Sequence, residues 1–437
     1  MTPALLALLC CASLAPNDND WPRFRGTGGT GVQSELRFPD TWDAETHLAW
    51  SIDIPGAGWA SPLVLGERIY VSTATGWTAG PRGFATGVAD PSTYGRGTEV
   101  EDELTYWLLC FALEDGEQLW AREVGSGIPE FNVHASNTFA TETPATDGER
   151  IYVTYGALGE LVAYDLEGEE VWRAETGVHP TGNSFGWGIS VVTGGGLTYL
   201  QSENERGSFL AAFDAESGEE RWRAERGTGS SWGTPVFWSE GERESLVALG
   251  PGTIHGYAPE DGRLLWELTG LGGGFSSSPT VDGERLYAGN SGPMSRGPLV
   301  AVRPGLEGSH DVRTAEGAEA LAWNVERAGP GFPSPVVSDG LLYVLGSSAI
   351  LACYDASTGE RLWRERLPDA TQIVASPWVA GDRLFFLDET GTTYVLRVGP
   401  EYELLHTNEL EGLYWSTPSI AGDSLLLREA QRLHCIR

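Results

Sequence analysis

The sequence predicts an all-β protein folded as an eight-bladed β-propeller of four-stranded antiparallel blades. One pattern recurs along the chain every 40 to 57 residues or so, which is the period of a four-stranded propeller blade. Gly accounts for 58 of 437 residues, and the chain also holds 25 Pro and 17 Trp. Such a composition suits many short strands that are joined by tight turns.

The first half of each repeat predicts the two inner strands of a blade. It reads Ser/Thr-Pro, apolar residues, Gly-Glu/Asp-Arg and Ile/Leu-Tyr, as in Ser61-Pro62 followed by residues 66–70. Alternating apolar, β-branched and aromatic residues indicate strands, and Pro is tolerated where a strand begins. Eight starts occur, at Ser61, Thr143, Ser190, Thr234, Ser278, Ser334, Ser376 and Thr417, of which Ser190 begins a divergent copy without the Pro.

The second half of most repeats ends in a Trp, which Leu405 replaces in the seventh copy. The Trp lies four residues after the Gly of a predicted hairpin turn, as in Gly116 and Trp120, and Gly supplies the positive φ that such a turn needs. An indole is large enough to fill the wedge between neighbouring blades. We therefore expect a structural role between blades for Trp50, Trp120, Trp172, Trp222, Trp266, Trp323 and Trp363.

The two ends of the chain are expected to complete one blade together. The eighth copy stops at Arg437, before its final strand, and a spare strand of that type lies at residues 48–51. An N-terminal strand near Leu48 to Ser51 would therefore close the ring and remove the exposed sheet edges. We expect a signal peptide over 1–15, an N-terminal extension over 16–44 and one propeller over 45–437, with insertions at about 73–105 and 303–320.

The charge of the chain excludes several classes of function. Asp and Glu number 61 against 28 basic residues, all of them Arg, and the formal charge is −33. An acidic surface repels phosphate backbones, so we expect no nucleic-acid partner. Without Lys, a Walker A motif, a Schiff base and a Ser-Lys pair are all excluded.

The first fifteen residues resemble an export signal, with a short apolar run and a small-x-small pattern at residues 13–15. The run is too short to span a membrane, and no other stretch is long and apolar enough. We expect a secreted or periplasmic protein, with lipid anchoring at Cys10 or Cys11 left open. The other three cysteines share one slot of the repeat and are expected to be buried, unpaired thiols: Cys110, Cys353 and Cys435.

Two short segments match the sequence patterns of enzyme motifs but lack the secondary structure that those motifs require. The glycines of residues 26–31 match a dinucleotide-binding loop, yet no strand precedes them, so we interpret this segment as a flexible loop. Residues 229–233 match the Gly-x-Ser-x-Gly pattern around Ser231. A nucleophile elbow needs a strand before it and a helix after it, whereas here a loop leads into a strand.

The repeat resembles the pyrroloquinoline-quinone (PQQ)-like propeller repeats over about residues 45–437. That superfamily includes quinoprotein dehydrogenases and the outer-membrane assembly lipoprotein BamB. Residues 21–26, 134–138 and 207–214 are similar to bacterial PQQ-binding-like β-propeller repeat proteins, common in planctomycete-type genomes. The resemblance implies a BamB-like, non-catalytic binding or scaffold propeller, which docks a peptide or envelope protein on one face and which we expect to be a monomer.

The resemblance also leaves a quinoprotein alternative, the PQQ- and Ca²⁺-dependent oxidation of an alcohol or sugar. Glu142 is the one acidic candidate near the channel, and one carboxylate is a poor Ca²⁺ site because that ion takes six to eight oxygens. We therefore predict no catalytic residue, no metal site and no cofactor. His134 and Asn137 are weak candidates, for which hydrogen bonding within a loop is the competing interpretation.

Six aromatic residues precede the repeat starts by two or three positions. In a propeller this point lies at the mouth of the central channel. Aromatic side chains in a concave mouth suit a peptide, a sugar or a flat ligand, which keeps a cell-surface glycan-binding module as a further alternative. The competing interpretation is that they stack on one another and plug the channel. The six are Trp59, Trp187, Trp232, Phe275, Phe332 and Trp415.

Overall fold

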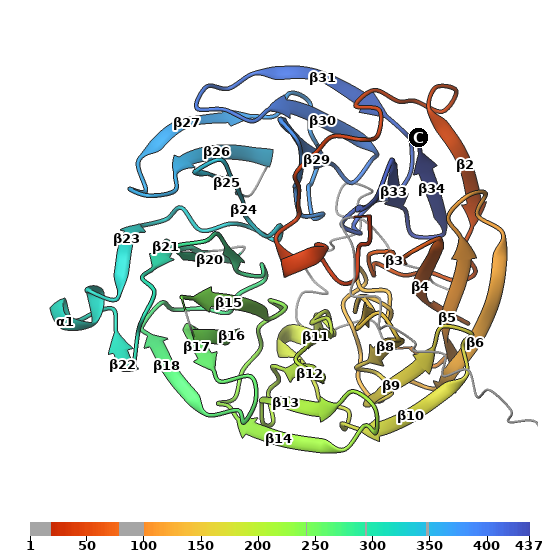
Figure 1. The fold of residues 1–437 in the computed structure, drawn as a ribbon, viewed down its shortest axis with the longest axis horizontal. Helices are drawn as coiled ribbons and strands as arrows, with labels where there is room; N and C mark the ends of the chain where they lie inside the picture. The colour runs from red at the N-terminus through yellow and green to blue at the C-terminus, as the bar shows by residue number, and fades with distance from the viewer. Residues whose placement is uncertain (1–18, 78–99, 242, 293–294, 347–348) are drawn as a thin grey trace, which may run out of the picture.

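The computed structural model describes residues 19–77, 100–241, 243–292, 295–346 and 349–437, which form a ring of eight antiparallel blades (Figure 1). Six blades have four strands, and two carry a fifth strand in parallel. The single α-helix in this part of the chain is α1 (Ala315–Ala318), with short 3-10 turns at Thr27–Gly29 and Gly182–Ser184. The predicted all-β, eight-bladed propeller is confirmed.

Each blade runs from an inner strand at the channel to an outer strand at the rim. Blade 1 is β3 (Leu63–Leu65), β4 (Arg68–Thr75), β5 (Leu104–Ala112) and β6 (Gln118–Gly127); blade 2 is β7 (Ala145–Thr146), β8 (Arg150–Tyr155), β9 (Glu160–Asp165) and β10 (Glu170–Glu175); blade 3 is β11 (Val192–Gly194), β12 (Leu197–Ser202), β13 (Phe209–Asp214) and β14 (Glu220–Glu225); blade 4 is β15 (Val236–Glu240), β16 (Arg243–Gly250), β17 (Thr253–Tyr257) and β18 (Leu264–Thr269).

The second half of the ring repeats this order. Blade 5 is β19 (Thr280–Val281), β20 (Leu286–Gly292), β21 (Ser295–Val302) and β23 (Leu321–Val325); blade 6 is β24 (Val336–Ser338), β25 (Leu341–Leu345), β26 (Ile350–Asp355) and β27 (Arg361–Arg366); blade 7 is β28 (Trp378–Ala380), β29 (Arg383–Leu387), β30 (Thr392–Arg397) and β31 (Leu404–Glu409); blade 8 is β32 (Ser419–Ala421), β33 (Ser424–Arg428), β34 (Arg432–Ile436) and β2 (Leu48–Asp53).

Blade 8 combines both ends of the chain, as predicted. Strand β2 pairs antiparallel with β34, with Ser51 opposite His434 and Asp53 opposite Arg432. The N-terminal strand thus supplies the outer strand that the last repeat lacks. The three predicted thiols are buried and unpaired, each in register with the Trp of its own blade: Cys110 with Trp120, Cys353 with Trp363 and Cys435 with Trp50.

The Ser or Thr that starts each repeat links neighbouring blades by a hydrogen bond. The backbone N–H of Ser61 donates to the hydroxyl of Thr143 at 3.0 Å, that of Thr143 to Ser190 at 3.0 Å, and the chain of bonds continues through seven of the eight interfaces. The hydroxyl of Ser61 is buried and accepts no such bond in the described part of the chain. The ring of hydroxyls is therefore interrupted where blade 8 meets blade 1.

The predicted interblade tryptophans fill the wedges between blades in five clear cases. Each indole packs over the turn glycine of the next blade and donates its N–H to a backbone carbonyl there, at 2.9 to 3.3 Å: Trp50, Trp120, Trp172, Trp222 and Trp323. Trp363 instead meets Tyr402 of blade 7 edge-on. Trp266 is fully buried and packs over Gly256 of its own blade.

The different position of Trp266 accompanies the insertion predicted at 303–320. Strand β22 (Gly308–Asp311) lies in this insertion and pairs in parallel with β18, which places Gly308 opposite Trp266. The insertion thus extends blade 4 rather than forming a loose loop. For the insertion predicted at 73–105, β4 runs on to Thr75 and β5 begins at Leu104; residues 78–99 and the predicted signal peptide lie outside the described residues.

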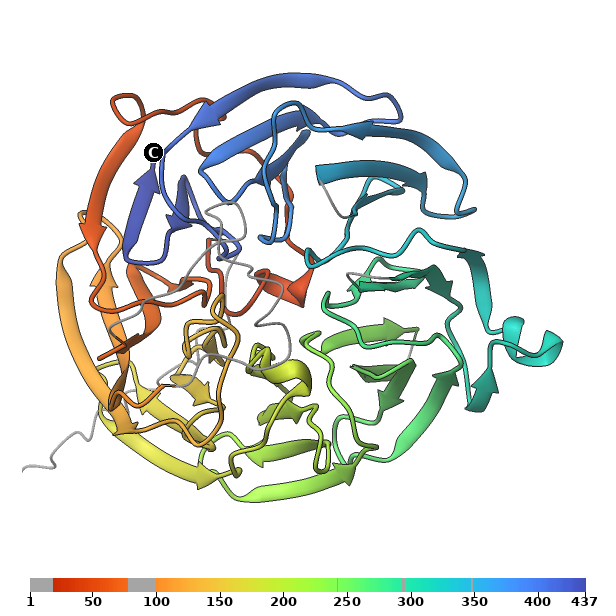
Figure 2. The same cartoon turned by 180° about the vertical axis from the view of Figure 1, so that it is seen from behind.

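The N-terminal extension enters the central channel. Residues 20–33, which we call the channel segment, form the red ribbon at the centre of both views (Figures 1 and 2). Trp21 exchanges backbone hydrogen bonds with Val64, and β1 (Val32–Gln33) pairs in parallel with β28. The prediction of a flexible glycine-rich loop at 26–31 was wrong, because these residues lie along the inner strands of several blades.

Arg25 fixes the channel segment across the ring. Its guanidinium donates to the carbonyl oxygens of Thr30, Pro279 and Pro335, and none of these partners is a carboxylate. Complete burial lowers the pKa of Arg25 to about 9. Asp20 accepts a hydrogen bond from Gly66 in the turn after β3, so the segment fills the end of the channel where inner strands turn into second strands. We call this the closed end.

No helix in the described ranges is long and apolar enough to cross a membrane.

Candidate binding site at the channel mouth

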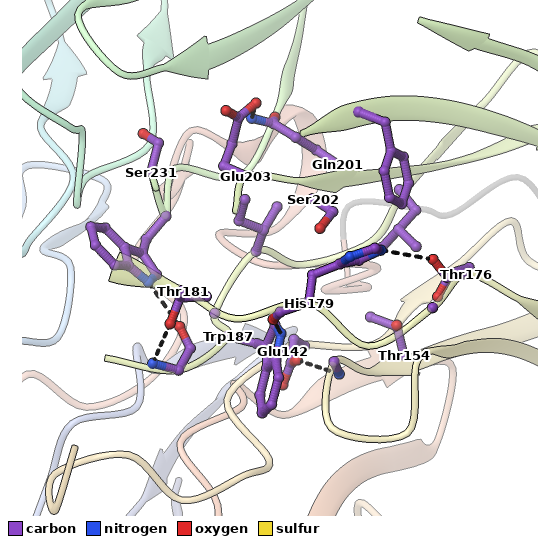
Figure 3. A pocket seen from close by; sticks show the side chains of 18 residues that line it. Glu142, Thr154, Thr176, His179, Thr181, Trp187, Gln201, Ser202, Glu203 and Ser231 are labelled. Carbon is purple, nitrogen blue, oxygen red and sulfur yellow. Dashed lines mark hydrogen bonds between the residues drawn. The ribbon is translucent and has the colours of Figure 1, made fainter. Parts of the chain in front are cut away.

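The opposite end of the channel, which we call the mouth, is built from the loops that lead from one blade into the next. A small cavity of about 40 Å³ opens there between blades 2 and 3, with room for a few water molecules. Figure 3 shows Glu142, Trp187 and Glu203 in its walls, and Trp232 also lines it. Three of these four are residues that the sequence analysis singled out.

Glu142 forms the base of this cavity. It is 3% exposed, and its carboxylate accepts backbone hydrogen bonds from Gly156 at 2.8 Å and Thr141 at 3.2 Å. Burial raises the pKa of Glu142 to about 7, although the backbone N–H groups oppose the rise. No positive charge in the described structure contributes to this pKa. Near neutral pH the group therefore exists in both protonation states and is able to accept or donate a proton.

A second carboxylate, Glu203, lies on the opposite wall and is electrostatically different (Figure 3). Arg226 pairs with it, and both side chains are almost fully buried. Burial raises the pKa of Glu203, whereas Arg226 and the amide of Gln201, which donates at 2.9 Å, lower it. The cavity thus holds one carboxylate that has a cationic partner and one that has none.

The tryptophans form the outer wall of the cavity. The indole of Trp187 packs against Gly156, where a side chain would collide with it, and donates to the carbonyl of His179 at 2.9 Å. Trp232 donates to the carbonyl of Gly186 at 2.9 Å and meets Phe185 edge-on. Both indoles are partly exposed, so each presents part of its ring at the mouth.

The remaining mouth aromatics do not form one continuous ring. Trp59 is buried and stacks on Trp415 at 5.7 Å between ring centroids, which matches the interpretation that some of these residues plug the channel. Phe275 is 1% exposed and belongs to the core between blades 4 and 5. Phe332 is 37% exposed. The structure therefore brings Trp187 and Trp232 together with Glu142 and leaves the other four elsewhere.

The two weak candidates shape the wall behind Trp187. Asn137 donates to the carbonyls of Phe185 and Trp187, at 3.1 and 3.2 Å. His134 is 4% exposed, lies within 2.7 Å of the hydroxyl of Ser136 and packs against Phe185; burial lowers its pKa. Both residues thus make the loop hydrogen bonds of the competing interpretation. Ser231 is buried, with its hydroxyl bonded to the backbone of Phe275.

The sequence did not predict several residues that line the cavity, namely His179, Gln201 and Glu203. Glu203 directly follows β12 and Arg226 directly follows β14, so their pair joins the ends of two strands of blade 3, and Arg226 also donates to Tyr257 of blade 4 at 2.8 Å. No local motif signals such an arrangement.

The side chains around the cavity do not provide the oxygen ligands that a Ca²⁺-bound quinone requires. Within the described ranges, no group of three or more His, Cys, Asp or Glu side chains is placed to hold a metal ion. Both oxygens of the Glu142 carboxylate already accept backbone N–H groups, from Gly156 and Thr141. We therefore derive no chemical step through PQQ.

Comparison with known proteins identifies the family. The family model described as "Outer membrane protein assembly factor BamB" matches residues 105–230, 205–301 and 308–435. A curated BamB of Yersinia pestis is 23% identical over 323 residues, which cover 70% of this chain and 76% of that protein. A BamB of Bordetella pertussis is 26% identical over 397 residues, covering 68% and 95%.

Quinoprotein dehydrogenases are also similar to the chain. A 1-butanol dehydrogenase (cytochrome c) of Thauera butanivorans is 34% identical over 100 residues, but these cover 22% of this chain and 13% of that enzyme. Among solved structures, BamB of Moraxella catarrhalis has a TM-score of 0.54 at 15% identity, covering 77% and 94% of the two chains. A europium-containing methanol dehydrogenase has a TM-score of 0.59 at 13% identity, covering 95% and 91%.

The similarity of this chain to the two solved structures shows the fold alone. The family model, by contrast, covers most of the chain in three matches. The chain therefore belongs to the PQQ-like β-propeller repeat family represented by the outer membrane protein assembly factor BamB.

Proposed function

We propose that this chain is a non-catalytic, extracytoplasmic binding propeller of BamB type, secreted or periplasmic, which docks a peptide segment or an envelope protein on the mouth face. The observation that carries this proposal is the difference between the two ends of the channel. The channel segment occupies the closed end, while the mouth presents partly exposed aromatic rings at Trp187, Trp232 and Phe332. Aromatic rings at a concave surface are frequent anchors for protein partners.

The relatives support the same proposal. The curated relatives that cover two thirds or more of this chain are named as assembly factors, and an assembly factor acts by contact with other proteins. The charge of −33 adds selectivity, because it favours partners with basic surfaces and disfavours acidic ones.

The docking face is tested by site-specific photo-cross-linking in intact cells. A photoreactive phenylalanine analogue replaces Phe332 at the mouth in one variant and Glu284, in the turn after β19 at the closed end, in the control. We expect one discrete cross-linked envelope protein from the mouth position, and we expect Trp232→Ala to reduce the yield of this cross-linked product. Cross-links from the closed end alone would contradict the proposed face.

The buried carboxyl of Glu142 favours one competing function, proton transfer in an oxidation. This alternative is tested by titrating the purified protein with PQQ and Ca²⁺ while the Trp fluorescence and dye-linked turnover on alcohols and sugars are measured. Because Trp187 and Trp232 line the cavity, a bound quinone would quench part of the fluorescence. We expect neither saturable quenching nor turnover; both together would replace the scaffold proposal by a quinoprotein dehydrogenase.

A further inference from the structure

The outer strand of blade 6 departs from the charge pattern of its counterparts. Strand β27 reads Arg-Leu-Trp-Arg-Glu-Arg, whereas β10 reads Glu-Val-Trp-Arg-Ala-Glu and β14 reads Glu-Arg-Trp-Arg-Ala-Glu. The three strands have equivalent registers, because the Arg after each Trp lies opposite a small apolar residue of the adjacent strand: Arg173 opposite Val162, Arg223 opposite Ala211 and Arg364 opposite Ala352. The formal charge of the strand is thus +2 in blade 6, against −1 in blade 2 and 0 in blade 3.

In blades 2 and 3, a glutamate three residues earlier neutralises this arginine. Arg173 pairs with Glu170 at 2.7 Å, and Arg223 pairs with Glu220 at 2.6 Å. In blade 6 the corresponding residue is Arg361, so two arginines stand where the other blades form an ion pair. In a chain with 61 acidic residues, a local excess of positive charge that is not neutralised is unusual.

These arginines line a cavity of about 270 Å³ between blades 5 and 6. Arg361 and Arg364 come from β27, and Arg327 comes from the turn after β23, which is the neighbouring rim strand in Figure 1. Within the described ranges, none of the three has a carboxylate oxygen within 4.0 Å of its guanidinium nitrogens. Glu326 is the one acidic residue among the described residues that line the cavity, so the lining has a formal charge of +2.

The floor of this cavity is apolar, with one phenol. Val344 and Ala352 are buried at its base, and Tyr354 is 3% exposed beside them. Burial raises the pKa of Tyr354, whereas Arg361 and Arg364 lower it, which places both guanidinium groups close to the phenol oxygen. The cavity therefore offers charged donors at its rim and an apolar surface beneath them.

We propose that this cavity, which we call the arginine cavity, binds a small organic anion through a carboxylate or phosphate group. Guanidinium groups bind both kinds of oxyanion through paired N–H donors. The apolar floor would contact the body of the ligand, and the surrounding negative charge of the protein would disfavour anions everywhere else. The site lies apart from the mouth cavity and is independent of the proposed docking function.

Calorimetric titration of the full chain tests the proposal with three probes at 50 mM salt: glucuronate, inorganic phosphate and glucose. We expect saturable binding of glucuronate, of phosphate or of both, and none of glucose. The probe that binds shows whether the oxyanion is a carboxylate or a phosphate. Raising the salt to 500 mM should weaken the binding, since the interaction is between charges.

Arg361→Glu is the decisive variant, because it restores the ion pair of blades 2 and 3 and should therefore fold. We expect it to weaken anion binding at least tenfold, with the midpoint of thermal unfolding unchanged or raised. Arg263→Glu, with the same change of charge at an exposed turn of blade 4, should bind as the original does. Equal binding of glucose, binding that Arg361→Glu leaves intact, or no binding of either anion at millimolar concentration would overturn the proposal.

Discussion

The two ends of the channel differ in how far their aromatic rings are exposed, although each end holds a buried charge without an oppositely charged partner among the described residues. At the closed end, Trp21 is buried against Gly26, and Arg25 is held by three carbonyl oxygens. At the mouth, Glu142 is buried without a cation, and the indoles of Trp187 and Trp232 are left partly exposed. Buried rings contribute to stability, and exposed rings at a concave surface are frequent anchors for partners, so the comparison assigns stability to the closed end and binding to the mouth.

The largest expected effect is at the closed end. Trp21→Ala removes an indole that is 2% exposed and that anchors the channel segment to β3. We expect a loss of about 3–5 kcal/mol in the free energy of unfolding, as for other buried Trp to Ala changes. Denaturant unfolding at pH 7 measures it, with Trp187→Ala at the mouth as the comparison. Equal losses in the two variants would remove the distinction between the ends.

The next effect is the pH dependence that Glu142 imposes. Its pKa is about 7 in the folded protein against 4.5 for the free group, so the folded state binds the proton more tightly. The resulting stabilisation is full below pH 4.5 and is lost as the pH rises through 7, by about 3 kcal/mol at 1.36 kcal/mol per pKa unit.

Glu142→Gln should remove this dependence. The variant should match the original protein near pH 5 and exceed it in stability at pH 8, because an amide carries no charge at either pH. Denaturant unfolding between pH 5 and 8 tests this, with Glu219→Gln on the exposed turn of blade 3 as the control. Parallel curves for the original protein and Glu142→Gln would show that Glu142 is not the titrating group.

A smaller effect is expected at the ring of hydroxyls that links neighbouring blades. Ser334→Ala leaves the N–H of Ser278 without its acceptor, and a buried donor left unpaired costs about 1–3 kcal/mol. Ser61→Ala removes a buried hydroxyl that accepts no such bond and should change stability by less than about 0.5 kcal/mol. Comparable losses in both variants would mean that the ring of bonds does not hold the blades together.

The sequence could predict the structural features that recur from blade to blade, but not the features that occur once in the chain. Five of the seven interblade tryptophans follow from spacing, because each lies four residues after a turn glycine, and the closing strand follows because the last repeat lacks its final strand. The channel segment does not repeat, and its partner Val379 lies hundreds of residues from Val32, so its place in the channel depends on contacts that no local pattern encodes.

The mouth was predictable in part for the same reason. Glu142, Trp187 and Trp232 lie one to three residues before a repeat start, in the stretch that leads into an inner strand, and the structure brings them to one cavity. Phe275 lies three residues before its repeat start, as Trp187 does, yet its backbone carbonyl accepts the N–H of Trp232 and its ring packs into the core. Local loop geometry thus decides which of the equivalent aromatics face the mouth.

The smallest expected effect on stability separates these two kinds of aromatic residue. Phe332→Ser changes a side chain that is 37% exposed and should cost less than about 0.5 kcal/mol, as for most surface substitutions. Phe275→Ser places a hydroxyl in a buried site and should cost about 3–5 kcal/mol, as for other large-to-small core changes.

Binding should show the reverse order if the mouth is the docking face. Phe332→Ser should weaken the binding of the partner that the photo-cross-linking experiment identifies, because it removes an exposed ring while the fold is retained. Phe275→Ser, measured at a temperature where it remains folded, should bind as well as the original protein does. If Phe275→Ser alone weakened binding, the exposed rings would not carry the interaction, and the partner would depend on the shape of the loop between β18 and β19 instead.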